Sequence, residues 1–147
     1  MRALGLAGPQ ETLRADAPAH EAGLVLSRIQ TSAVLVVDDG GFVDVVTEED
    51  LLRALLPGYI GDADALARVV EEGSSEQLWA RLEGRTVRDL IAAGREHKPM
   101  VEGDATLVEV ASVMVRAGVP IVAVVQEHRI VGGITIDHLL SHLMPRG

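Results

Sequence analysis

Residues Val43–Pro57 read VDVVTEEDLLRALLP and residues Val131–Pro145 read VGGITIDHLLSHLMP, so one pattern occurs twice in the chain. In each copy a β-branched run, which favours a strand, reaches a threonine and then a leucine-rich helix that ends at proline. The chain therefore carries a strand-to-helix junction in two copies. We expect its function to lie at such a junction.

The similarity extends well beyond the two junctions. Residues 12–57 align with residues 100–145 without a gap. Identical residues recur along the whole alignment, including Asp16/Asp104, Glu21/Glu109, Arg28/Arg116, Thr47/Thr135 and Pro57/Pro145. Self-similarity at a fixed offset over this length indicates an internal duplication.

Each copy predicts a short α/β unit. In the first copy, Asp16 and Pro18 are typical of a helix start, with Asp16 as the cap. The expected elements of that copy are a helix to Ile29, a strand Ala33–Val37, a turn at residues 38–41, a strand Phe42–Val46 and a helix from Thr47. Those of the second copy are a strand at Met100, a helix over Leu107–Met114, strands Ile121–Val125 and Ile130–Ile134, and a helix Asp137–Leu143. The fold class is therefore α/β.

We divide the chain into repeat 1 (residues 1–58), a helical insertion (residues 59–84) and repeat 2 (residues 85–147). Residues 1–11 have no clear period and predict a short helix or an extended arm. The insertion has apolar stripes that a globular chain must bury. They could pack on the protein's own helices, extend a dimer interface or meet another protein, and the first reading is favoured.

Composition excludes several classes of function. The chain has a formal net charge of −9 and one residue each of Trp, Tyr and Phe, a combination that disfavours nucleic-acid binding. No apolar run approaches the roughly 20 residues of a membrane span, and the apolar patch in residues 1–8 is too short for a signal peptide. The absence of cysteine excludes disulfides and thiolate sites. We expect a soluble, cytoplasmic protein.

No catalytic pattern is recognisable. The sequence lacks Gly-x-Ser-x-Gly, Walker-type and HExxH motifs, and its histidines have no evident nucleophile beside them. His138 and His142 share a helix face, but two histidines without a fixed third ligand are a weak metal signal. We predict that the chain is no enzyme and needs no metal or obligatory cofactor.

The duplicated unit resembles the cystathionine β-synthase (CBS) domain, of which two tandem copies form a Bateman module. The resemblance rests on two β-α-β-β-α repeats, each with a return strand that leads into a Thr-x-x-Asp-type turn. The matching residues are Ala33–Val37, Val43–Asp50 and Leu51–Leu52 in repeat 1, and Val119–Val125, Val131–Thr135 and Leu139–Leu140 in repeat 2. It implies two repeats packed about a pseudo-two-fold axis, two clefts, and a homodimer. It also implies an adenosine-containing ligand that regulates another, unknown protein.

The resemblance implies a set of ligand-binding residues. The threonine and the aspartate of the turn would face the cleft, and the carboxylate would accept hydrogen bonds from ribose hydroxyls. Backbone groups at Thr12–Leu13 and Gln30–Val34 would read the adenine edge. The whole set is Thr47, Asp50, Thr12, Leu13, Thr31, Ala33, Arg53, Thr135, His138, Val119 and Ile121.

Each implied role has a simpler alternative. Thr47 and Asp50 also satisfy the pattern of a helix capping box, so capping and ligand contact are both open. Arg53 could reach a phosphate or could belong to a solvated helix face.

The two junctions differ in the residues that a ligand would meet. His138 replaces the aspartate in repeat 2, which weakens ribose recognition there, although Gly132 and Gly133 should leave that cleft open. In repeat 1, Asp44 and neighbouring acidic residues predict a negative cleft, which favours ligands of low negative charge, such as adenosine or S-adenosylmethionine, over ATP. The alternative function is a structural or interaction module that has lost nucleotide binding.

Overall fold

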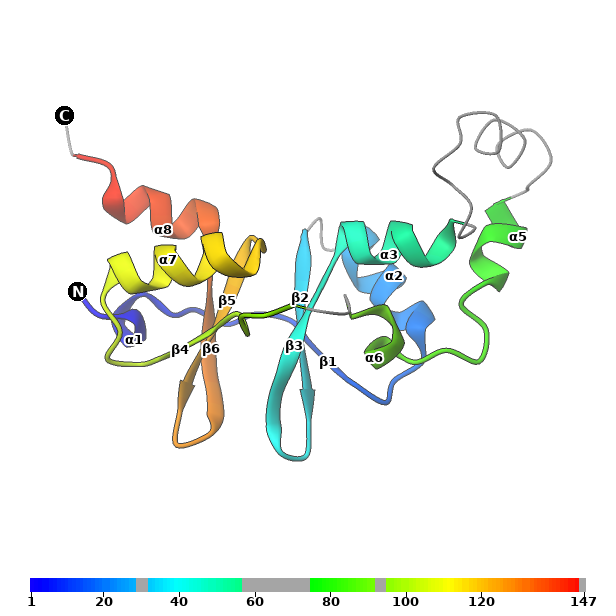
Figure 1. Cartoon of the computed structure of the whole chain (residues 1–147), viewed down its shortest axis with the longest axis horizontal. Helices are drawn as coiled ribbons and strands as arrows, with labels where there is room; N and C mark the ends of the chain where they lie inside the picture. The colour runs from blue at the N-terminus through cyan, green and yellow to red at the C-terminus, as the bar shows by residue number, and fades with distance from the viewer. Residues whose placement is uncertain (29–31, 57–74, 92–94, 146–147) are drawn as a thin grey trace.

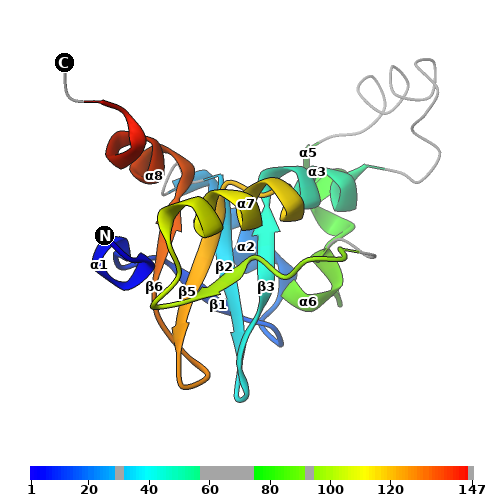
Figure 2. The same cartoon turned by 60° about the vertical axis from the view of Figure 1, so that its left-hand side comes forward.

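Two three-stranded sheets stand next to each other at the centre of the molecule, and helices cover their outer sides (Figure 1). The computed structural model describes residues 1–28, 32–56, 75–91 and 95–145. The turned view of Figure 2 shows the same arrangement, with α7 of one repeat and α3 of the other along one edge of the molecule. The predicted α/β class is confirmed.

Each repeat has the predicted order β-α-β-β-α. Repeat 1 contains β1 (Thr12–Arg14), α2 (Ala19–Arg28), β2 (Ala33–Asp38), β3 (Gly41–Thr47) and α3 (Glu48–Leu55). Repeat 2 contains β4 (Met100–Glu102), α7 (Leu107–Ala117), β5 (Ile121–Gln126), β6 (Arg129–Thr135) and α8 (Ile136–Leu143). Three short helices complete the described chain: α1 (Ala3–Leu6), α5 (Ser75–Ala80) and α6 (Val87–Leu90).

The two sheets have the same topology and the same register. In repeat 1, β1 runs parallel to β2, which pairs antiparallel with β3; β4, β5 and β6 repeat this order. Ala33 pairs with Thr47, and Ile121 pairs with Thr135 at the matching place. Even the register shift recurs, at Val36/Val37 and at Val124/Val125. The duplication read from the sequence is thus a duplication of backbone structure.

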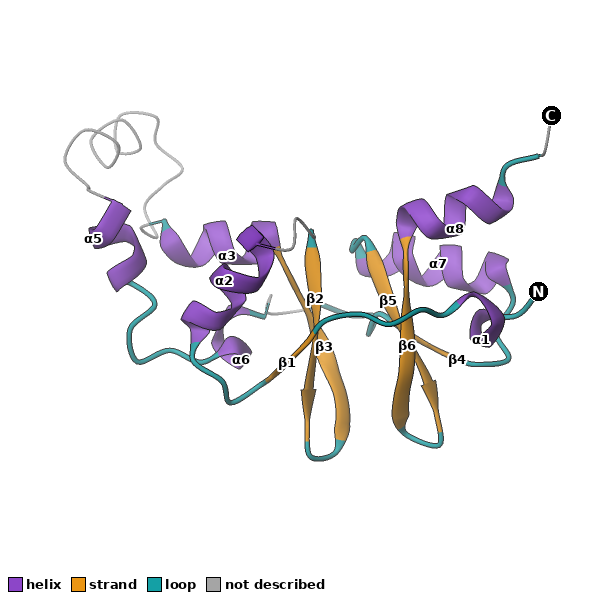
Figure 3. Cartoon of the chain, turned by 180° about the vertical axis from the view of Figure 1, so that it is seen from behind, coloured by secondary structure: helices purple, strands orange, loops and turns teal. Residues whose placement is uncertain are grey.

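The short helices α1 and α6 are exchanged between the repeats. The Ala3 N–H of α1 donates to the Ala105 carbonyl of repeat 2 at 2.8 Å. The Val87 N–H of α6 donates to the Ala17 carbonyl of repeat 1, also at 2.8 Å. Figure 3 shows the chain running from α1 beside repeat 2 to β1 in the sheet of repeat 1. The packing units are therefore interleaved along the sequence, and each repeat is held by a helix that precedes the other.

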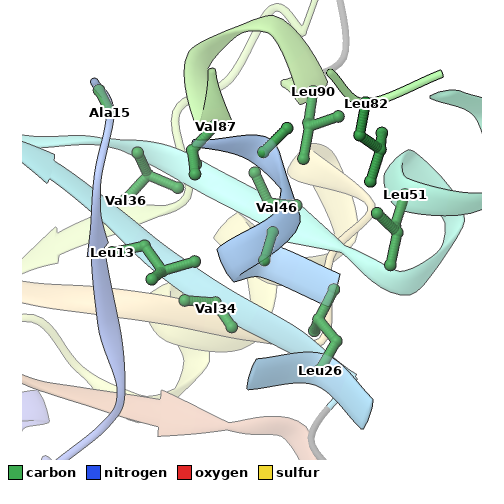
Figure 4. Packing of buried hydrophobic residues seen from close by; sticks show 12 residues of the cluster. Leu13, Ala15, Leu26, Val34, Val36, Val46, Leu51, Leu82, Val87 and Leu90 are labelled. Carbon is green, nitrogen blue, oxygen red and sulfur yellow. The ribbon is translucent and has the colours of Figure 1, made fainter. Parts of the chain in front are cut away.

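Three apolar clusters stabilise this arrangement. One lies between α2, α6 and the sheet of repeat 1, and Figure 4 shows Val46 of β3 between Leu90 of α6 and Leu26 of α2. A second cluster occupies the matching place in repeat 2 and includes Leu6 of α1. The third lies between the two sheets and contains Leu35 and Ala123. β2 and β5 have an apolar cluster on each of their two faces. Because alternate strand residues face opposite sides, almost every residue of these two strands is buried, and both strands are continuous apolar runs in the sequence.

Two expectations about the chain before α2 need revision. Residues 1–11, expected within repeat 1, include α1, whose Ala3 and Leu6 are buried in the core of repeat 2. Asp16, expected to cap α2, instead pairs with Arg14 at 3.0 Å on the surface. The cap occurs in the second copy at Thr106, whose hydroxyl accepts from the Glu109 N–H at 3.1 Å.

The described part of the insertion packs on the protein's own helices. Trp79 of α5 stacks on His20 of α2 with ring centroids 6.4 Å apart. A Cβ at Gly23 would lie 2.5 Å from the indole ring, so the glycine makes room for it. The sequence also predicts an apolar helix face at Ala65, Leu66, Val69 and Val70 of the insertion, and these residues lie outside the described ones.

Candidate functional site

The junction of repeat 1 is a complete capping box. Thr47 ends β3, and its hydroxyl accepts a hydrogen bond from the Asp50 N–H at 3.1 Å. The Asp50 carboxylate in return accepts from the Thr47 N–H at 2.9 Å. A capping box satisfies free N–H groups in the first turn, and the negative charge suits the positive end of the helix dipole. The capping role considered for these residues is confirmed.

Asp50 also lies at the floor of a cleft. The residue is 4% exposed, and it is the one charged residue classed as buried in residues 1–28, 32–56, 75–91 and 95–145. A cleft of about 410 Å³ opens above it. The lining residues come from α3, from the segment before β4 and from the end of α7: Thr47, Glu49, Asp50, Arg53, Arg95, Glu96, His97, Arg116, Ala117 and Gly118. Both repeats therefore contribute to one cleft.

Arg95 is the least exposed arginine of this cleft. Its side chain is 10% exposed and forms an ion pair with the Asp44 carboxylate of β3. Its Nη1 also donates to the Val45 carbonyl at 3.2 Å, and its Nη2 lies 3.9 Å from Asp50. The guanidinium thus joins the segment before β4 to the junction of repeat 1.

Two more arginines line the cleft. Arg53 bridges Glu49 at 3.1 Å and Asp50 at 3.2 Å, but its side chain is 59% exposed. Arg116 lies in the last turn of α7 and is exposed, and its guanidinium has no hydrogen bond or ion pair within the described parts of the chain. The side chains of Arg53 and Arg116 therefore bring one cation from each repeat to the cleft.

Arginines offset part of the negative character that the sequence predicts for this cleft. Asp44 is neutralised by Arg95, so its charge does not face the cleft alone. Asp38 and Asp39 lie at the far end of the β2–β3 hairpin, beside a separate hollow that includes His128. These carboxylates are close to Thr47 along the chain, which is why the sequence predicts that they lie near it. In the structure the length of β3 separates them, so that they lie at the opposite end of the hairpin from Thr47.

The junction of repeat 2 is less complete. The Thr135 hydroxyl accepts from the His138 N–H at 3.4 Å, but no carboxylate returns to the Thr135 backbone because His138 replaces the aspartate. The exposed His138 ring instead lies edge-on to His142, with centroids 5.0 Å apart. Neither Thr135 nor His138 lines the 410 Å³ cleft. Among the described residues no group of three or more potential metal ligands occurs.

The glycines of repeat 2 pack closely against the segment between α1 and β1. The N–H groups and carbonyls of Gly133 and Gly8 form two reciprocal hydrogen bonds, of 2.9 and 3.0 Å. A Cβ at Gly132 would lie 2.9 Å from the Gly8 carbonyl oxygen, and one at Gly133 would lie 2.7 Å from the Gln10 side chain. The glycines therefore let the segment between α1 and β1 pack against β6, which corrects the expectation of an open approach.

The remaining predicted residues lie elsewhere. Leu13 is buried in the core of repeat 1, and Ala33 and Ile121 belong to the cluster between the sheets. Thr12 is exposed on β1, and Val119 is buried beside Gly118. None of these five lines the described cleft, and Thr31 lies outside the described residues.

Arg95, His97 and Arg116 were missed as candidates. Two sequence signals point to them. The run Arg95–Lys98 (REHK) is basic in an acidic chain, and Arg116 recurs as Arg28 at the same place in the other copy. Which junction these residues approach depends on the exchange of the short helices, which the sequence pattern does not reveal.

Comparisons with known proteins agree with this architecture. The family model described as "CBS domain" matches residues 9–57 and 86–145. A CBS domain-containing protein of unknown function from Kribbella flavida is 34% identical, with a TM-score of 0.81, over 97% of this chain and 98% of that one. The CBS domain of a membrane protein from Sphaerobacter thermophilus is 25% identical, with a TM-score of 0.70, over 99% and 90% of the two chains. A search of curated protein sequences found no match.

A third structure is more distant. CBSX2, a protein of Arabidopsis thaliana, was solved in complex with AMP; it is 18% identical, with a TM-score of 0.66, over 97% of this chain and 95% of that one. This likeness shows a shared fold.

The two β-α-β-β-α units, held together by their exchanged short helices, define a tandem-repeat α/β module. The chain belongs to the CBS-domain family and carries a tandem pair of these domains. CBS-pair proteins are generally regulatory modules without catalysis of their own. None of the described helices is long and apolar enough to cross a membrane.

Proposed function

We propose that the cleft at the junction of repeat 1 binds an adenosine-containing ligand with a phosphate, of the AMP type, and that binding regulates a partner protein. The observation that carries the proposal is the meeting of a buried carboxylate, Asp50, with arginines from both repeats in one cleft. A carboxylate suits vicinal ribose hydroxyls, and guanidinium groups suit a phosphate. The volume lies within the roughly 300–1,000 Å³ of small-molecule sites.

The charges favour AMP over both adenosine and ATP. Arg53, Arg95 and Arg116 supply three positive charges, of which that of Arg95 is offset by Asp44, and Glu49, Asp50 and Glu96 line the same cleft. A lining with so little surplus positive charge accepts one phosphate more readily than a triphosphate. The structure of CBSX2 with AMP supports the same ligand class at the level of fold.

Calorimetric titration with adenosine, AMP and ATP tests this proposal. We expect AMP to bind most tightly. Arg116→Gln should weaken AMP binding about tenfold, because a charge-assisted contact to the phosphate is lost, and should leave adenosine binding unchanged. Arg28→Gln is the matched control, since Arg28 holds the same position in repeat 1 and lines no part of the cleft.

A second pair of variants tests ribose recognition. Asp50→Asn should weaken both adenosine and AMP. Asp89→Asn removes the carboxylate of an equivalent capping box in α6, outside the cleft, and should weaken neither. Equal losses in the two variants, or no heat with any of the nucleotides, would contradict the proposal.

The alternative is an interaction module with no nucleotide. The observation that favours it is that Asp50 and Arg95 already have partners inside the protein. In that case the titrations show no heat of binding, and a partner protein binds whether or not nucleotide is present. In either case we propose that two copies of the chain associate through the edge of the molecule along which α3, α7 and α8 lie. We also propose that the protein acts in the cytoplasm without catalytic activity.

A further inference from the structure

Arg95 stands between the cleft and a carboxylate that does not itself line the cleft. Its guanidinium forms part of the cleft wall, while Asp44 lies behind it on β3. Both side chains are largely buried, at 10% and 14% exposure. The Asp44 Oδ1 also accepts from the Val45 N–H at 2.7 Å, which holds the carboxylate in place. The Arg95–Asp44 ion pair is therefore a largely buried and hydrogen-bonded part of the site.

The Asp44 carboxylate competes with any anion in the cleft. Its charge offsets that of Arg95, and Arg95 Nη1 is shared between Asp44 and the Val45 carbonyl. A phosphate in the cleft would have to use the remaining donors of a guanidinium whose positive field is already reduced. In a largely buried site this opposition is stronger than it would be in water.

Arg116 makes the competition measurable. Within residues 1–28, 32–56, 75–91 and 95–145 it has no hydrogen-bond or ion-pair partner, so no ion pair among these residues opposes its attraction for a phosphate. Arg95 has to exchange a partner. Three arginines therefore contribute to the affinity of the cleft for a phosphate. Arg116 and Arg53 attract it directly, and the contribution of Arg95 is reduced by its ion pair with Asp44.

We propose that Asp44 is an internal competitor that holds down the affinity of the cleft for a ligand's phosphate by occupying Arg95. The inference rests on the proposed function and concerns the regulation of the same site. The affinity for the phosphate is set by a residue that never touches the ligand. Ligand and Asp44 exchange at Arg95, in the segment that leads from α6 to β4.

The decisive variant is Asp44→Asn, which keeps the side-chain shape and removes the charge. AMP should bind about tenfold more tightly than to the parent protein, whereas adenosine should bind equally well. Asp38→Asn is the matched control. It removes the same charge from an ion-paired carboxylate on the neighbouring strand, whose partner Arg88 lies outside the cleft at 3.3 Å from Asp38. This control should leave both affinities unchanged.

A purely structural role for the ion pair gives a different result. If Asp44 and Arg95 serve only to hold the segment before β4, Asp44→Asn weakens adenosine and AMP together and lowers the melting temperature. That result overturns the proposal. Adding Arg95→Gln to Asp44→Asn should abolish the gain in AMP affinity, and a gain that persists also overturns it.

Pyrophosphate separates this inference from the proposed function. If no variant binds adenosine or AMP, the proposed function fails. Pyrophosphate should still bind Asp44→Asn more tightly than the parent protein, because the competition concerns the anion alone. Equal pyrophosphate affinities in the two proteins would overturn the competitor role.

Discussion

At the residue scale, two carboxylates with similar sequence context have different surroundings. Asp50 and Asp89 both close capping boxes, but Asp50 is buried at the cleft and Asp89 is solvent-exposed. The hydrogen bond from the Thr86 N–H holds the pKa of Asp89 below its ordinary value. The hydrogen bond from Arg14 lowers the pKa of Asp16 in the same direction.

These shifts predict how stability depends on pH. A carboxylate with a lowered pKa in the folded state stabilises the protein above its unfolded pKa of about 3.9, and this contribution is lost as the pH falls through the folded value. The urea midpoint of the parent protein should therefore drop between about pH 5 and pH 3. In Asp89→Asn the midpoint should start lower at neutral pH and drop less over this range.

Asp104→Asn serves as the control for that measurement. The Asp104 side chain has no hydrogen-bond partner among the described residues, and its backbone carbonyl is the group that Arg2 contacts. The midpoint of this variant should follow that of the parent protein. An Asp89→Asn curve that is parallel to the parent curve would contradict the role given to the capping box.

At the element scale, glycine positions decide which segments pack together. Gly23 lets α5 dock on α2 through Trp79, and Gly133 lets the segment after α1 dock on β6. In both places a Cβ would meet the neighbour at less than 3 Å. The sequence displays these glycines, but it does not say which segment approaches them.

The Trp79 contact can be tested directly, because Trp79 is the one tryptophan in the protein. Gly23→Ala should displace the indole ring toward solvent and shift its fluorescence to longer wavelength. Alanine favours the helix by about 1 kcal/mol relative to glycine, and the lost contact costs a similar amount, so overall stability should change little. Gly8→Ala, where a Cβ meets nothing within 4 Å, should leave the emission unchanged. Unshifted emission in Gly23→Ala would mean that α5 does not rest on α2.

At the scale of the whole molecule, the helices of both repeats lie along one edge and expose apolar side chains. α3, α7 and α8 share this edge in Figures 1 and 3. Their exposed apolar residues are Leu52, Val108, Val115, Ile136, Leu140 and Leu143. Exposed apolar residues on helices of both repeats are suited to a second copy of the chain, because the same edge of two copies can meet about a two-fold axis.

Dimerisation through this edge predicts the effect of one charged substitution. Val115 of α7 is 81% exposed, so Val115→Glu should leave the fold intact and convert a dimer into a monomer in sedimentation analysis. Val131→Glu on β6 introduces the same charge away from these helices and should remain dimeric. A parent protein that is monomeric at all accessible concentrations would exclude this assembly.

Local sequence was sufficient for the repeat, the order of its elements and the capping pattern at Thr47. Strand and helix periodicity, β-branched runs and Thr-x-x-Asp spacing act within a few residues, and a duplication makes each signal appear twice. The sequence therefore determined two β-α-β-β-α units, and its family resemblance was confirmed.

Tertiary structure decided which segments meet at the cleft. The exchange of α1 and α6 brings Arg95 to Asp44 and places residues 7–10 against Gly132 and Gly133. The ends of these contacts lie 51 residues apart in one case and more than 100 in the other. Such contacts depend on how the two repeats pack and not on local propensity. The residues next to Asp44 in the sequence therefore predicted acidic surroundings, whereas in the structure Asp44 pairs with Arg95. The sequence by itself determined the repeated unit, and only the folded chain decided that arginines from both repeats line the cleft at the junction of repeat 1.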